Sequence, residues 1–234
     1  MTRWVLSPLR GEIKDLLASV GPGTPLELPG SAEVFRCGDA LVGWTGVGAQ
    51  AVRRTLVALC AAEPLPEWAV LVGVAGALVP ELEPGQVFRV KGCYADAEPV
   101  AAPRVRLPDV LAGLPGADVA CVSQVAGPER KRALASELPG ATLVDMETAW
   151  AFLAAAELGL PLGAVRAVCD RRDQAIPDLG DALDPVGRVR PLKFAKRLLK
   201  QPGSARALPG LGRAFAQATG SLTPLLRAAL ASGA

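Results

Sequence analysis

The stretch that decides the fold is "LVDMETAWAFLAAAELGLPLGAVRAVCD", residues 143–170. An apolar segment at 141–146 is followed by an alanine-rich segment at 147–158 with helical character and by a second apolar segment at 162–170. Strand–helix–strand units of this length normally cross over right-handed and leave their two strands parallel. The stretch therefore predicts an α/β protein in which strands 141–146 and 162–170 run in the same direction.

Composition supports this class and excludes several functions. Half of the 234 residues are hydrophobic but only 4% are aromatic, which fits a tightly packed α/β core. The net charge of +2 is too small to indicate a nucleic-acid partner. The chain contains no histidine, which excludes a histidine general base, a Ser-His-Asp triad and most zinc sites. We predict no metal site.

The cysteines and the amino-terminal residues bear on the cellular compartment. The five cysteines are odd in number and none has CxxC spacing, so we expect reduced thiols that mostly pack in the core. Charged residues soon follow the short apolar segment at the start of the chain, unlike a signal peptide. No apolar run reaches the ~20 residues that span a bilayer. We expect a cytoplasmic protein.

The remaining elements complete one α/β domain over residues 1–234, with a mixed central β-sheet flanked by helices. Residues 128–138 read as an exposed helix and residues 99–116, rich in proline, as an irregular connection. Residues 171–234 form a lid loop followed by a helical extension, which Pro209, Gly210 and Pro224 interrupt. Further strands are predicted at 3–7, 68–78, 85–95 and 118–123, a hairpin around Gly38-Asp39, and helices at 11–20, 49–62 and 192–201.

Acidic residues follow several of these strands. In open α/β sheets ligands bind outside the carboxyl ends of the strands. Glu12 follows strand 3–7, Glu147 follows strand 141–145, and Asp170 ends the strand at 162–168. The glycine-rich "GVAG" (73–76) reads as a turn after strand 69–72, and "WTGVG" (44–48) as a second turn. If the strands run parallel, these features line one cleft.

Each of these residues also has a purely structural explanation. Glu12 and Glu147 could be acids of a first helical turn, where the helix dipole favours them. Asp145 reads most simply as an N-cap, and Asp170 could begin the next loop. Arg166 lies inside an apolar strand and needs a buried partner, for which Glu12 or Glu147 are candidates. No Walker motif and no complete dinucleotide fingerprint is present. The shared position of the acids favours a site.

The same residues resemble a known family. "VDMET…GLPLGAVRAVCD" resembles the signature of the purine nucleoside phosphorylase and 5'-methylthioadenosine/S-adenosylhomocysteine nucleosidase superfamily, with matches at Met146, Glu147, Arg166 and Asp170. "GVAGAL…PGQV" resembles the family's glycine turn, and Glu12 matches the general base of the nucleosidase branch. "CDRRDQAIPD…ALDPVGRVRPLKFAKRLLKQPG" resembles the hopanoid-associated phosphorylase branch, which implies release of adenine from an adenosylated lipid precursor.

The resemblance implies a role for each residue. Asp170 would donate a proton to the purine N7, with a pKa raised by burial. Glu147 would accept from ribose hydroxyls, and Glu12, assisted by Arg166, would activate water. The family stacks the base on an aromatic residue near 118–125, where this chain has none. The predicted substrate-binding residues are Met146, Glu147, Val74, Ala75, Gly76, Thr45 and Val125.

The sequence leaves the nucleophile open. Val74 replaces a hydroxyl residue of the family's glycine turn, which favours hydrolysis. Arg10, in "SPLRGE", lies where phosphorylases carry a phosphate-binding arginine, and Thr45 could supply a hydroxyl. We predict a hydrolase acting on a purine nucleoside. Phosphorolysis and a non-catalytic nucleoside-binding protein are the alternatives.

Other partners follow from the resemblance and from the tail. The chemistry implies no cofactor, and family members are commonly homo-oligomers, so we expect one here. The basic stretch "GRVRPLKFAKRLLKQPGSAR" (187–206) could touch a membrane, although an amphipathic helix packed on the domain is the favoured interpretation.

Overall fold

The computed structural model describes residues 2–28, 32–176 and 202–232, and for residues 202–208 it describes the backbone alone. Its sheet begins with parallel neighbours in the order β4 (Ala40–Trp44), β1 (Arg3–Ser7), β5 (Trp68–Ala77) and β10 (Leu162–Asp170). The predicted hairpin is present, since β3 (Glu33–Cys37) pairs antiparallel with β4. The two-residue β2 (Thr24–Pro25) extends this edge.

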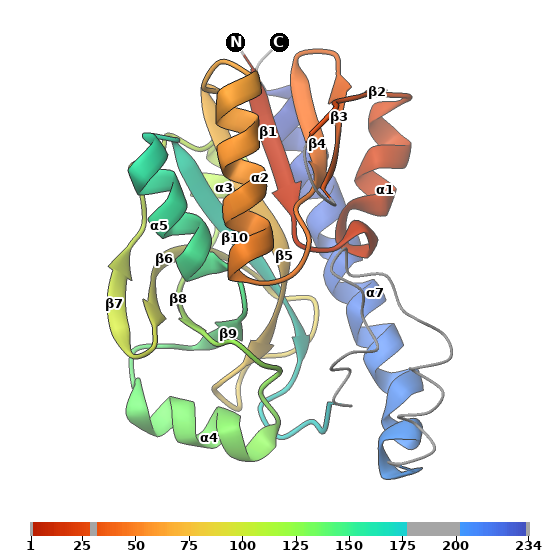
Figure 1. Ribbon diagram of the computed structural model, residues 1–234. Coiled ribbons are helices and arrows are strands. Elements are labelled where there is room, and N and C mark those ends of the chain that lie inside the picture. Colours follow the sequence, from red (N-terminus) through yellow and green to blue (C-terminus); the bar gives the residue numbers. More distant parts are fainter. Residues whose placement is uncertain (1, 29–31, 177–201, 233–234) are drawn as a thin grey trace.

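The other end of the sheet closes on itself. β6 (Val87–Ala95) pairs antiparallel with β10, and β8 (Gly116–Cys121) pairs parallel with β6. β9 (Leu143–Asp145) then joins β8 to β5. These pairings link β5, β10, β6, β8 and β9 in a ring, which forms the lower part of the molecule in Figure 1. β7 (Glu98–Ala101) is attached to β6 outside the ring. The predicted mixed α/β architecture is confirmed.

One predicted strand direction is wrong. β9 runs antiparallel to β5, whereas β10 runs parallel to it, so β9 and β10 do not run the same way. β9 has only three residues, and it pairs with Gly76 and Ala77 at the carboxyl end of β5. Helix α5 (Thr148–Leu158) then carries the chain to the start of β10, where Leu162 pairs with Ala69.

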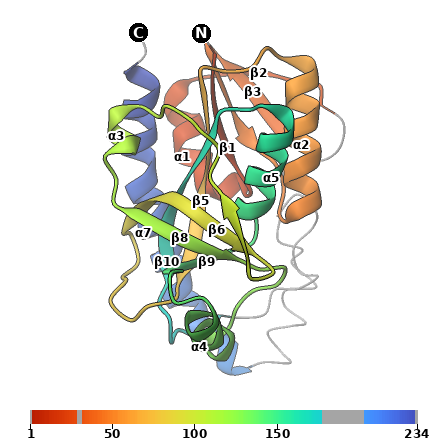
Figure 2. The same cartoon turned by 90° about the vertical axis from the view of Figure 1, so that its left-hand side faces the viewer.

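Helices cover both faces of the sheet, as Figure 2 shows. Helices α2 (Ala49–Ala62) and α5 pack on one face, and α1 (Arg10–Val20) and α7 (Pro202–Ala231) pack on the other. Alternation along the strands feeds both cores. In β1, Trp4 and Leu6 belong to the core under α2 and α5, and Val5 belongs to the core under α1 and α7.

Helix α7 is longer than the sequence predicts. It continues through Pro209 and Pro224, which we had expected to interrupt it. A proline inside a helix removes one hydrogen bond and costs about 3 kcal/mol, so tertiary packing must offset it. Ala218, Leu222 and Leu226 are buried in the core shared with α1 and β10, and this packing holds the helix together.

Three other segments also differ from the prediction. Residues 73–76 stay within β5 rather than forming a turn. The connection at 99–116 contains most of β7 and a short helix α3 (Asp109–Ala112). Helix α4 (Pro128–Glu137) is largely exposed as expected, but Lys131 in it is fully buried. Most of the predicted lid loop and the predicted helix at 192–201 lie outside the described residues.

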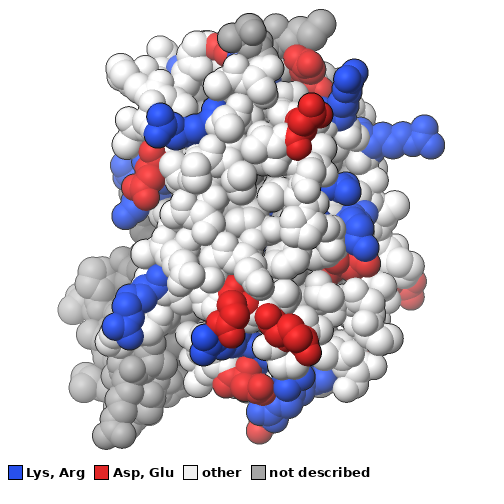
Figure 3. Space-filling view, turned by 180° about the vertical axis from the view of Figure 1, so that it is seen from behind, with Lys and Arg blue, Asp and Glu red and all other residues white. Residues whose placement is uncertain are grey.

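The surface and the long helices give two further findings. On the face seen in Figure 3, acidic and basic side chains are interspersed around a broad uncharged middle, with no large patch of one sign. Within the described parts of the chain, no helix has the length and apolarity needed to cross a membrane.

Candidate active site

The antiparallel course of β9 brings the acidic residues together. Gly76 of β5 pairs with Val144 of β9, so the chain leaving β9 at Asp145 runs back along β5 toward Val74 and Gly73. Glu12 reaches the same part of β5 from the first turn of α1, directly after β1. The acids therefore converge beside the middle of β5, although not for the reason that the sequence suggested.

Glu12 is buried and fully engaged with the backbone. Its carboxylate accepts the N–H groups of Val74 and Leu9, both at 2.9 Å, and the hydroxyl of Ser7. Burial raises the pKa of Glu12, against the opposing effects of these hydrogen bonds and of Arg166. The residue thus caps its own helix and also holds a carboxylate inside the protein.

The glycine at position 73 makes this approach possible. A Cβ atom there would lie 3.0 Å from the Glu12 Oε1 atom and 3.3 Å from the Arg166 Nη1 atom. Both distances are tighter than about nine in ten Cβ contacts in real structures, so the two side chains would have to move. The glycine-rich segment therefore serves close approach of side chains within a strand, rather than a turn.

Glu147 lies at the start of α5, and its side chain reaches the second glycine turn, at residues 44–48. It is the N-cap residue of α5, and its carboxylate accepts the N–H of Gly48 at 2.9 Å. Gly48 is the N-cap of α2 and has a φ of +88°, a conformation that favours glycine. Burial, followed by the nearby charge of Asp145, raises the pKa of Glu147 to about 8.

Arg166 is the buried cation of the cluster. Its Nε donates to Asp145 at 2.7 Å and its Nη1 to the carbonyl of Leu71 at 3.2 Å. The predicted direct partner, Glu12 or Glu147, is wrong, because the antiparallel β9 places Asp145 nearest to the guanidinium. Both glutamates still lie close enough to raise the pKa of Arg166.

Asp145 has two functions in the structure. Besides pairing with Arg166, it accepts the backbone N–H of Thr148 at 3.3 Å and the hydroxyl of the same residue. The predicted N-cap assignment is therefore wrong, because Glu147 is the N-cap residue of α5, although Asp145 does accept an N–H of the first turn. The Nη2 atom of Arg166 has no partner among the described residues and is inaccessible to solvent.

Asp170 is the last residue of β10, and it lies beside β5 three residues beyond Gly73. It pairs opposite Gly76 and forms a buried ion pair with Lys131 of α4. Lys131 also donates to the carbonyl of Arg171 at 2.9 Å. A Cβ at Gly76 would lie 2.8 Å from the Asp170 Oδ2 atom and 3.0 Å from the Lys131 Nζ atom, so a larger residue there would require the pair to shift.

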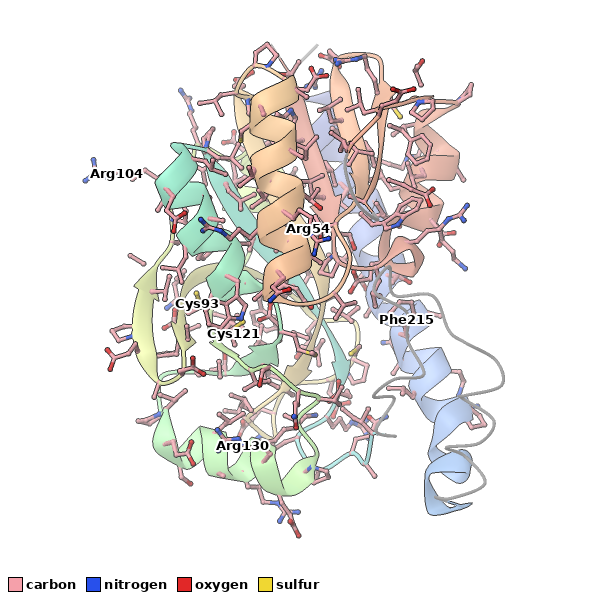
Figure 4. The ribbon with its side chains drawn as sticks, viewed as in Figure 1. Arg54, Cys93, Arg104, Cys121, Arg130 and Phe215 are labelled. Atoms are coloured by element: carbon pink, nitrogen blue, oxygen red, sulfur yellow. The ribbon has the colours of Figure 1, made fainter. Side chains whose placement is uncertain are left out.

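Sequence reasoning missed Lys131. In "PERKRALASEL" it stands between Arg130 and Arg132, which are both more than half exposed, and nothing in the pattern distinguishes it. Figure 4 shows Arg130 on α4 below the ring of strands. Only the buried carboxylate of Asp170, which needs a partner, could have drawn attention to a nearby cation.

The other predicted site residues differ in how deeply they are buried. Thr45 is buried, and its hydroxyl donates to the carbonyl of Gly46 at 2.9 Å. Ala75 is buried, while Met146 and Val74 are partly buried. Arg10 is exposed, and its guanidinium lies 5.3 Å from the centre of the Trp44 ring.

Val125 lies on a different cavity. It is 41% exposed and lines a space of about 500 Å³ together with Gln124 and Tyr94. In the described part of the chain, no hydrogen bond or ion pair joins Val125 or Arg10 to Glu12, Glu147 or Arg166. The stretch at 121–125 contains no aromatic residue, but Tyr94 of β6 supplies one beside it.

The cysteines near the site are packing residues. Cys93 and Cys121 are buried inside the ring of strands (Figure 4), and all five cysteines are free thiols. Burial raises the pKa of Cys93 to about 12 and also raises the pKa of Cys121. Thiols that stay protonated are poor nucleophiles.

Comparison with known proteins agrees with this architecture. Residues 116–200 match the family model described as the phosphorylase superfamily. The chain is similar to the 5'-methylthioadenosine/S-adenosylhomocysteine nucleosidase from Helicobacter pylori, with a TM-score of 0.68 and 17% identity over 97% of this chain and 98% of that one. Futalosine hydrolase from the same organism gives a TM-score of 0.68 and 16% identity, with 97% of both chains covered.

A third structure is equally well covered. S-adenosylhomocysteine nucleosidase from Streptococcus pyogenes gives a TM-score of 0.64 and 17% identity over 97% of this chain and 96% of that one. Comparison with curated protein sequences gives no match. The matched segment and the shared fold confirm the predicted resemblance to the nucleoside phosphorylase and nucleosidase superfamily. They support the predicted enzyme class, a nucleosidase or nucleoside phosphorylase.

Proposed function

We propose that this protein hydrolyses the N-glycosidic bond of a purine nucleoside. The observation that carries the proposal is the convergence of Glu12 and Arg166 beside Gly73 of β5, with Glu147 close enough to raise the pKa of Arg166 and with Asp170 of β10 opposite Gly76. The family match and the shared fold support the reaction class, because nucleosidases are among the proteins with this architecture.

The chemistry of the reaction fits these groups. Breaking an N-ribosyl bond develops positive charge on the sugar and negative charge on the departing base. Glu147 accepts hydrogen bonds from the ribose hydroxyls and stabilises the developing cation. Glu12 takes a proton from the attacking water, and the positive charge of nearby Arg166 favours the ionised form of Glu12 that this needs. Asp170 delivers a proton to the base.

The charge of the site favours water over phosphate. Four carboxylates, those of Glu12, Asp145, Glu147 and Asp170, face two cations, Arg166 and Lys131. A phosphate nucleophile would add negative charge where carboxylates are already in excess, which burial makes costly. Val74 offers no hydroxyl, and the guanidinium of Arg10 lies against Trp44 instead of among the carboxylates.

Two expectations remain predictions. Release of adenine from an adenosylated lipid precursor rests on residues 169–203, most of which lie outside the described part of the chain. A homo-oligomeric state rests on the resemblance to the family. Both can be examined once turnover of a simple nucleoside is established.

The proposal is tested with a panel of nucleosides. Adenosine, methylthioadenosine, S-adenosylhomocysteine, inosine and futalosine are incubated with the protein, with and without phosphate, and the free base and the sugar product are measured. We expect free base and unphosphorylated sugar without added phosphate. Strict dependence on phosphate would overturn hydrolysis. Binding of a nucleoside without any turnover would indicate a binding protein.

A pair of variants on α1 links turnover to the site. Glu12→Gln keeps the shape of the side chain but removes the base, so we expect kcat to fall roughly 10²- to 10⁴-fold. Asp15→Asn, an exposed position on the same helix, is the matched control and should leave kcat unchanged. Similar activity of the Glu12 variant and the control would contradict the assignment of Glu12.

A further inference from the structure

Lys131 occupies a position that structural stability alone does not explain. Its side chain is fully buried, between Asp170 of β10 and the carbonyl of Arg171. Lysine is almost never fully buried unless it is paired, and a buried ion pair is often no more stabilising than apolar residues of similar volume. Gly76 leaves the space that the pair needs. The chain therefore maintains a costly arrangement next to the proposed proton donor.

The arrangement also changes how Asp170 can work. A general acid must carry a proton, yet an ammonium group in direct contact with a carboxylate favours the ionised carboxylate. In the free protein the proton of this pair therefore belongs mainly to Lys131. Asp170 alone would reach the base without a proton to donate.

We propose that Lys131 and Asp170 act as one acid, in which Lys131 supplies through Asp170 the proton that the departing purine receives. This inference rests on the proposed function. As the bond between the sugar carbon and the base nitrogen breaks, its electron pair moves into the purine. The purine takes a proton from Asp170, and Asp170 takes one from the Nζ of Lys131. Lys131 is left as a neutral amine and regains its proton from water after the products leave.

The surroundings of Lys131 suit this function. Asp170 and Cys169 of β10 and Asp173 of the following loop are the titratable groups that face it. Burial lowers the pKa of Lys131 to about 8, which makes it a stronger acid than an ordinary lysine while it remains protonated at neutral pH. Lys131 acts through Asp170 and does not itself contact the substrate in this scheme.

The test separates proton supply from a purely structural tie between α4 and β10. Lys131→Met is compared with wild type on a purine nucleoside and on p-nitrophenyl riboside, whose phenolate leaves without protonation. We expect kcat/KM for the purine nucleoside to fall about 100-fold or more, and for the nitrophenyl riboside by less than about threefold. Arg130→Met, at an exposed position on the same helix, is the control and should leave both values unchanged.

The pH profile provides a second measurement. Wild-type kcat for the purine nucleoside should decline above about pH 8. Lys131→Arg should have a lower kcat without a decline near pH 8, because arginine neither loses its proton there nor passes it readily to Asp170. Equal losses on both substrates overturn the inference. If the methionine variant does not fold or the wild type rejects the nitrophenyl riboside, a decline near pH 8 that persists in Lys131→Arg overturns it. A wild type without any turnover instead refutes the proposed function.

Discussion

Removing the positive charge of Arg166 is the most informative test of the buried cluster. Arg166 and Asp145 are both about 1% exposed, and their Nε and Oδ2 atoms are 2.7 Å apart. Arg166→Met leaves Asp145 buried without its cation and withdraws the charge that lowers the pKa of Glu12 and Glu147. Breaking a buried pair from one side costs about 3–5 kcal/mol. At about 2–4 °C per kcal/mol for a chain of this size, the melting temperature should fall by roughly 6–20 °C.

The assay is urea unfolding of four proteins: wild type, Arg166→Met, Asp145→Asn and the double variant. Replacing both partners removes the uncompensated charge, so the double variant should recover most of the free energy of unfolding lost in Arg166→Met. The amide oxygen introduced by Asp145→Asn can still accept the N–H of Thr148 and cap α5. A loss below about 1 kcal/mol in Arg166→Met, the size expected of an exposed pair, would show that the pair is hydrated and would refute the reasoning.

Three further outcomes are expected. Gly76→Ala should displace the pair of Lys131 and Asp170 and lower kcat on the order of 100-fold, whereas Gly127→Ala, with open space around it, should not. The wild-type free energy of unfolding should fall as pH rises from about 5 to 8. The reason is that Glu147 has a pKa of about 8 in the folded protein and its ordinary value of 4.5 in the unfolded chain, so the folded state holds one more proton in this range. Glu147→Gln should flatten this pH dependence in urea titrations. A nucleoside mimic with a cationic ring in place of ribose should release a proton from Glu147 on binding near pH 7. A proton count of zero, measured by calorimetry in buffers of different ionisation enthalpy, would argue against a protonated Glu147 in the free site.

Much of the fold could be predicted because local signals are strong in this chain. The segments at 3–7, 49–62 and 162–170 have the observed boundaries, since periodicity and breakers there agree. The closed ring of strands could not be predicted, because closure depends on pairings between residues far apart in the sequence, such as Gly76 with Val144. The glycines at 73–76 were misread as a turn because glycine marks both turns and sites of close approach.

The types of residue in the candidate site could be predicted from the sequence, but the hydrogen bonds and ion pairs between them could not. Acidic residues after strands identified Glu12, Glu147 and Asp170, and the need of a buried arginine for a partner was correct. The partner itself, Asp145, depended on the direction of β9. Nothing in the sequence pointed to Lys131. Only Lys131 and Leu134 are buried in α4, and two positions in a charged helix are too few to form a periodic apolar pattern.

The protonation of the site connects its burial to its chemistry. With every group ionised, the four carboxylates outnumber the two cations, and a proton on Glu147, whose pKa burial raises to about 8, relieves part of this excess in the free protein near neutral pH. A neutral nucleoside does not change the balance when it binds. A sugar that gains positive charge as its bond breaks does change it, and the carboxylates attract that charge more strongly in a buried site than they would in water. The same burial that makes the empty cluster costly therefore stabilises the transition state more than the bound substrate, which is the condition for a faster reaction.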